Sequence, residues 1–132
     1  MNDLALKQLI EQLAFNQDGL VPAIAQQHDT GEVLMMAWMN ETSISETLKN
    51  SRVCYWSRSR QSLWRKGESS GQVQMLKHFR VDCDADTILL EVDQTGPACH
   101  TGRRSCFYRV VEGDGLIADA EPLIDPATLY GK

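Results

Sequence analysis

Three observations predict an α+β fold for this chain of 132 residues. Short apolar runs typical of strands outnumber helical patterns. Helical periodicity is confined to two short stretches in the first half of the sequence. The regular alternation of strands with crossover helices that a parallel sheet requires is missing. We therefore expect a compact, strand-rich single domain over residues 1–132, with short flanking helices.

The elements follow from local patterns. Leucine and isoleucine recur at helical spacing within residues 1–15 and predict a helix there. Asn40 can cap a second helix, in which Ser43 and Glu46 are spaced as a capping box. Strands are expected over residues 20–27, 32–39, 52–57, 72–81, 87–94 and 106–112, the first two forming a hairpin. Residues 113–132 contain two prolines and are expected to form a loosely organised tail.

The composition excludes several classes of protein. A net charge of −5 argues against a general nucleic-acid binder, which would show a basic surplus. The N-terminus lacks the pattern of a secretion signal, and no apolar run is long enough to span a bilayer. We therefore expect a cytoplasmic protein with no membrane segment. Stable disulfides are rare in that compartment, so the four cysteines are expected to be metal ligands, catalytic thiols or buried residues.

Three of the cysteines, Cys83, Cys99 and Cys106, cluster late in the chain. Three thiolates suit zinc and leave a fourth position open for water. Free cysteines also pack in cores as small hydrophobic residues, but Cys99 and Cys106 border a loop of Gly, Arg and Ser where a core thiol is out of place. Cys54 lies among large apolar residues and is interpreted as a core residue.

Asp82, Asp84 and Asp86 alternate along five residues. A hard divalent cation such as Mg²⁺ would relieve the repulsion between their carboxylates. In an extended strand the outer two would stand about 13 Å apart, too far for one ion. Either the segment curls, or water and substrate phosphates complete the shell. An acidic edge strand without metal is the plain alternative.

Two long polar connections, residues 58–71 and 96–105, are interpreted as the walls of a site. Their basic side chains, hydroxyls and tryptophan fit a phosphorylated aromatic ligand, although a basic surface loop is the commoner explanation of charge alone. The candidate substrate-binding residues are Arg58, Arg60, Trp64, Arg65, Lys66, Ser69, Ser70, Arg103 and Arg104. His100 adjoins Cys99 and is a candidate general base and acid, or else a fourth zinc ligand.

Four ordered motifs then make the chain recognisable: YWSRSR at 55–60, LWRKGE at 63–68, DCDAD at 82–86 and GPACHTGRRSCFY at 96–108. Together with GLVPA at 19–23 and TGEVL at 30–34, they resemble the phosphoribosyl-AMP cyclohydrolase family over about residues 19–108. Departures from the family pattern are mild: Trp38, Cys54 and Ser69 stand where Tyr, Thr and Thr are common. None of these positions is a proposed metal ligand.

The resemblance implies an enzyme of histidine biosynthesis that hydrolytically opens the adenine ring of phosphoribosyl-AMP at the N1–C6 bond. It implies about one zinc per subunit on Cys83, Cys99 and Cys106, and magnesium on Asp82, Asp84 and Asp86. Zinc-activated water would attack C6, with magnesium assisting. It also implies an intertwined homodimer whose zinc sites draw cysteines from both subunits.

Two other readings of the residues stay open without the resemblance. One is a zinc-stabilised module that binds RNA or nucleotides, which predicts four protein ligands and no turnover. The other is a Mg²⁺-dependent phosphohydrolase, which predicts phosphate release and indifference to zinc chelators.

Overall fold

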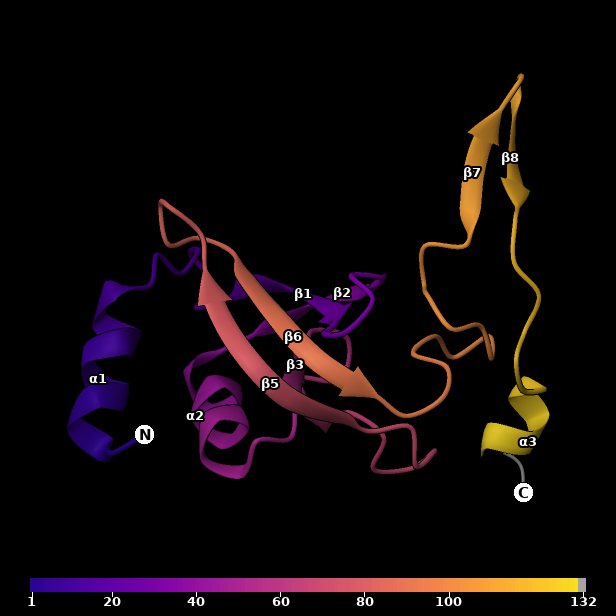
Figure 1. Cartoon of the computed structure of the whole chain (residues 1–132). Helices are drawn as coiled ribbons and strands as arrows, with labels where there is room; N and C mark the ends of the chain where they lie inside the picture. The colour runs from indigo at the N-terminus through magenta and orange to yellow at the C-terminus, as the bar shows by residue number, and fades with distance from the viewer. Residues whose placement is uncertain (131–132) are drawn as a thin grey trace.

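The computed structural model describes residues 1–130 and consists mainly of one curled, mixed sheet flanked by short helices (Figure 1). The helices are α1 (Asp3–Gln12), α2 (Glu41–Asn50) and α3 (Pro126–Tyr130). The strands are β1 (Val21–Gln27), β2 (Val33–Met39), β3 (Cys54–Ser57), β4 (Ser62–Arg65), β5 (Gln74–Val81), β6 (Ile88–Gln94), β7 (Arg109–Glu112) and β8 (Gly115–Ala118). The predicted α+β class is confirmed.

Six strands form the main sheet in the order β4-β3-β2-β1-β6-β5. Strands β1 and β6 run parallel, and the other neighbours run antiparallel. The segment before β3 also bonds to the opposite edge strand, β5. The N–H of Val53 donates to the Gln74 carbonyl at 3.0 Å, and the N–H of Leu76 donates to the Ser51 carbonyl at 2.8 Å. These bonds draw the two sides of the sheet together, so that it curls around its own core.

Alternation along β1 and β6 fills that core, because every second side chain of each strand is buried. The core also contains a series of polar side chains that are hydrogen-bonded to one another. The hydroxyl of Tyr55 donates to Gln74 Oε1 at 2.7 Å, and Gln74 Nε2 donates to Gln94 Oε1 at 2.8 Å. Gln94 Nε2 in turn donates to the Thr95 carbonyl at 2.9 Å. Buried amides therefore connect the centre of the domain to the start of the loop after β6.

The hairpin of β7 and β8 stands away from the main sheet (Figure 1). Every residue of both strands is exposed, including Val111 at 77% and Leu116 at 56%. These side chains give the hairpin an exposed apolar surface.

Three sequence expectations are corrected. Strand β4 lies inside the connection 58–71 that was expected to be loop, because pairing with β3 supports a polar segment that its own pattern does not identify. Strand β7 begins at Arg109, not at 106, since the Cys106 N–H bonds to the Leu34 carbonyl of β2. The expected tail contains β8 and α3, because β8 pairs with β7.

The start of α2 follows the predicted Asn40 cap with different partners. Asn40 Oδ1 accepts from the Ser43 N–H at 2.9 Å, and Ser43 Oγ accepts from the Asn40 N–H at 2.9 Å. The capping box is therefore formed by Asn40 and Ser43, while Glu46 binds Arg65. Within residues 1–130, no helix is both long enough and apolar enough to cross a membrane.

Candidate active site

The loop between β6 and β7 brings two thiols together. The Cys99 N–H donates to the Arg103 carbonyl at 3.1 Å and closes a tight turn, while the Cys106 N–H bonds to Leu34 at 2.7 Å. Cys106 is exposed as a residue, but desolvation of its thiol and the adjoining Cys99 raise its pKa to about 12. The Thr101 hydroxyl donates to Cys99 Sγ at 3.1 Å, so this sulfur already has a polar partner. The pair offers two soft ligands to one metal ion.

Lys66 lies beside this pair and is 3% exposed. Its Nζ donates to the Ala98 carbonyl at 2.7 Å and lies 5.4 Å from the centre of the Trp64 ring. Burial lowers the pKa of Lys66, while the charges of Cys106 and Cys99 act in the opposite direction. A cation from the first predicted loop therefore reaches the thiol loop.

Next to Lys66 is an open pocket of about 350 Å³ whose walls come from both predicted loops. It is lined by Arg60, Trp64, Lys66, Gly67, Glu68, Ser69, Ser70 and His100. The wall turns at Gly67, where φ is +84° and a Cβ atom would lie 2.6 Å from the backbone of Gln72. Side chains that can donate to phosphate thus face the same space as an indole and an imidazole.

The three aspartates lie at the turn between β5 and β6, where the segment curls instead of staying extended. One carboxylate oxygen from each of Asp82, Asp84 and Asp86 lies within 4.8 Å of the other two. Ala85 has φ +62°, and Asp82 Oδ1 accepts from the Asp86 N–H at 3.0 Å. Asp84 and then Asp82 raise the pKa of Asp86, the effect of crowded carboxylates.

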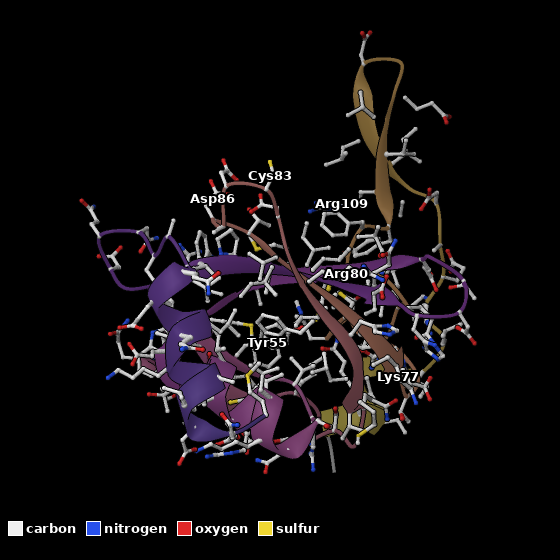
Figure 2. The ribbon with its side chains drawn as sticks, turned by 60° about the vertical axis from the view of Figure 1, so that its left-hand side comes forward. Tyr55, Lys77, Arg80, Cys83, Asp86 and Arg109 are labelled. Carbon is white, nitrogen blue, oxygen red and sulfur yellow. The ribbon has the colours of Figure 1, made fainter. Side chains whose placement is uncertain are left out.

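Cys83 is exposed at this same turn, shown beside Asp86 in Figure 2. Strand β6 separates it from Cys99, and the seven residues of that strand span roughly 20 Å. Among the described residues 1–130, the three cysteines do not form a three-ligand cluster within one chain. Cys54 is buried in β3, where burial and then Glu46 raise its pKa to about 12, as expected for a core thiol.

Two of the candidate arginines are engaged elsewhere in the chain. Arg65 Nε lies 2.7 Å from Glu46 Oε2, and the pair lines a separate pocket against α2. Arg104 donates from Nη1 to the carbonyls of Gln94 at 3.0 Å and Gly96 at 2.7 Å. Both guanidinium groups therefore have protein partners in place of a free face for phosphate.

Two further candidate arginines, Arg103 and Arg58, lie over aromatic rings. Arg103 stacks 4.0 Å from the centre of the Tyr108 ring and donates to the Ala120 carbonyl at 2.7 Å. Arg58 lies 4.7 Å from the centre of the Trp38 ring, beside the pocket wall and not within it. Neither residue lines the pocket that contains His100.

Besides Gly67, two residues of the site have no role assigned from the sequence. Glu68 lines the pocket, and Thr101 binds the sulfur of Cys99. Glu68 belongs to the motif at 63–68, close to Lys66, and Thr101 to the motif at 96–108, close to Cys99. This closeness in sequence is the feature that could have identified them as site residues.

Comparison with known proteins identifies the family of this chain. The model of the phosphoribosyl-AMP cyclohydrolase family matches residues 35–108. The chain is 68% identical to the phosphoribosyl-AMP cyclohydrolase of Alkalilimnicola ehrlichii, over 96% of this chain and 89% of that protein. It is 64% identical to the enzyme of that name from Halorhodospira halophila (93% and 87%) and 61% identical to the one from Rhodospirillum centenum (100% and 99%).

The family match defines the class of this protein as a hydrolase, and its carboxylate cluster could hold a metal ion. The chain belongs to the phosphoribosyl-AMP cyclohydrolase family, which acts in histidine biosynthesis.

Proposed function

We propose that this chain hydrolyses the N1–C6 bond of the adenine ring in 1-(5-phosphoribosyl)-AMP, using zinc and magnesium, as a cytoplasmic homodimer. The observation that carries the proposal is the pocket in which Trp64, Ser69, Ser70 and His100 adjoin the paired thiols of the next loop. Family membership supports the substrate.

The donor set fits zinc. Cys99 and Cys106 lie side by side in space, and their soft sulfur atoms bind zinc more readily than magnesium. Cys83 would complete the set of three protein ligands, and binding would displace the thiol protons. When bound, zinc supplies a water of lowered pKa as the nucleophile for hydrolysis.

The donor set at the β5–β6 turn fits magnesium. Asp82, Asp84 and Asp86 offer only oxygen, the ligand that this ion requires, and their crowding favours a cation. These carboxylates would hold magnesium where it assists in ordering water or substrate phosphate.

In the pocket, Trp64 offers its ring to the purine, and Arg60, Ser69 and Ser70 offer donors to phosphate. Arg58 lines a neighbouring hollow that shares Trp64 with this pocket. Arg65, Arg103 and Arg104 are left out of the proposed set, because their groups already have partners within the chain.

His100 is the proposed general base and acid. It lines the pocket one residue after Cys99, where an imidazole can accept a proton from the attacking water and pass it to N1. Oxygen from water bonds to C6 and the N1–C6 bond breaks. N1 departs from C6 and takes a proton of that water, and C6 stays on the imidazole ring of the product as a carboxamide. No ammonia is released, and the oxidation state does not change.

Two observations support the homodimer. Cys83 lies across the length of β6 from the other two thiols, so a second chain is needed to complete the zinc site. The β7–β8 hairpin exposes Val110, Val111, Leu116 and Ile117, which a second copy would cover.

The direct test is to incubate the pure protein with phosphoribosyl-AMP and to follow the ultraviolet change of ring opening. Activity should require zinc and disappear in Cys99→Ser, while Cys54→Ser, a buried thiol outside the site, should keep most of it. Full activity of metal-free Cys99→Ser would contradict the zinc mechanism. Release of inorganic phosphate without ring opening would favour the phosphohydrolase reading.

A further inference from the structure

We propose that Lys66 is a positioning residue that supplies the counter-charge of the thiolate metal centre and holds its loop, and that it is not a ligand of substrate phosphate. This inference rests on the proposed zinc site. It reassigns a lysine that the sequence pattern alone places among the phosphate-binding cations.

The position of Lys66 is fixed at both ends of the residue. Its backbone N–H donates to the Val53 carbonyl at 3.1 Å, directly before β3. At the other end, Nζ donates to the Ala98 carbonyl at 2.7 Å. Ala98 immediately precedes Cys99, so the side chain joins the wall of the pocket to the metal-binding loop.

The surroundings of the ammonium favour a thiolate partner. Lys66 is 3% exposed, and a buried cation is costly unless an opposite charge compensates it. No carboxylate of the described residues lies within 4.0 Å of its ammonium. The carbonyl that the ammonium contacts belongs to Ala98, the residue directly before the proposed ligand Cys99.

The net charge of the proposed metal centre also favours Lys66 as its counter-charge. One zinc ion with three thiolates carries a net charge of about −1, because only deprotonated cysteine ligates the metal. One buried ammonium neutralises that centre. Arg60, which is exposed and lines the same pocket, is better placed to meet a phosphate that arrives from solvent.

The test compares Lys66→Met with Lys66→Gln, which keeps a donor for the Ala98 carbonyl but removes the charge. Zinc affinity is measured by competition with a chromophoric chelator, and KM is measured on zinc-saturated enzyme. Both variants should bind zinc about 10–100-fold more weakly, the usual effect of losing a residue that supports metal ligands. KM for substrate should stay within about twofold of the wild-type value. Lys7→Met, the same change on an exposed position of α1, should alter neither quantity.

Wild-type zinc affinity in a folded Lys66→Gln protein, together with a strongly raised KM, would overturn the inference in favour of phosphate binding. If Lys66→Met fails to fold, the Gln variant still decides, because it keeps the donor. A wild-type protein that binds no zinc would overturn the proposed function itself, and the inference with it. The two failures are therefore distinguishable.

Discussion

The guanidinium of Arg104 donates a 2.7 Å hydrogen bond to the carbonyl of Gly96, across the loop that carries Cys99. The same group donates to the Gln94 carbonyl and to Gln27 Oε1. Arg104 thus closes the loop on itself and ties it to β1. A residue that the sequence suggests for substrate binding has structural partners on several sides.

Replacing Arg104 by Met should lower the free energy of unfolding by about 2–4 kcal/mol, because several charge-assisted bonds to partly buried acceptors are lost together. Urea unfolding measures this. Arg103→Met removes one carbonyl bond and a ring contact and should cost clearly less. Equal losses in the two variants would mean that Arg104 is not the main tie of the loop.

The conformation of the same loop also depends on a glycine at position 102. Its φ is +85°, and a Cβ atom there would lie 1.8 Å from the Ile124 carbonyl oxygen. Gly102→Ala should therefore displace residues 122–124 and lower the melting temperature. Gly113→Ala, which also has positive φ but open space around it, should cost only about 1 kcal/mol of backbone strain. Equal melting temperatures of the two variants would show that the segment around Ile124 shifts at little cost to accommodate the added methyl group.

Asp84→Asn should weaken the magnesium response without emptying the zinc site, since it removes one carboxylate from the cluster and no thiol. Activity after mild chelation should return on adding Mg²⁺ to the wild type, but only at higher Mg²⁺ in the variant. Asp114→Asn, an exposed aspartate in the β7–β8 turn, is the control. Loss of zinc from Asp84→Asn would mean that the aspartates support the thiolates directly.

His100→Ala should keep zinc and substrate binding while kcat falls by roughly 10²–10⁴, the usual contribution of a positioned proton-transfer group. A metal assay and one set of steady-state rates measure the two quantities. His28→Ala, in the exposed β1–β2 turn, should leave both unchanged. Loss of zinc affinity in His100→Ala would instead identify the imidazole as a fourth ligand.

Mixed dimers test the shared zinc site. Cys83→Ala and Cys99→Ala homodimers should both be inactive, because each of their sites lacks one ligand. In a mixed dimer both lesions fall in one site and the other site is intact. Refolding the two variants together should restore up to about half of the activity per mixed dimer, or a quarter overall for random pairing. No recovery, with mixed dimers demonstrated, would rule out a site built from two chains.

Much of this domain is predictable from local patterns. The buried alternation of β1 and β6 and the cap at Asn40 depend on residues close in sequence, so periodicity and capping chemistry identify them. The Asp82–Asp86 motif is similarly local. Its carboxylate repulsion suggests a cation, and its extended length requires either a curl or a shell completed by water and substrate phosphate. The curl is what the turn adopts.

The sequence by itself determined the α+β class, the family and the set of residue types available to the site. Tertiary structure decided which of them meet. Strand β4 depends on pairing with β3, and Arg65 turns to Glu46 while the neighbouring Lys66 turns to the thiol loop. Arg65 is the last residue of β4 and Lys66 the first after it, so two adjacent cations of one motif meet different partners. No local pattern encodes the burial and the partners of a side chain. These two properties distinguish Lys66, a buried counter-charge, from Arg65, which forms a surface ion pair.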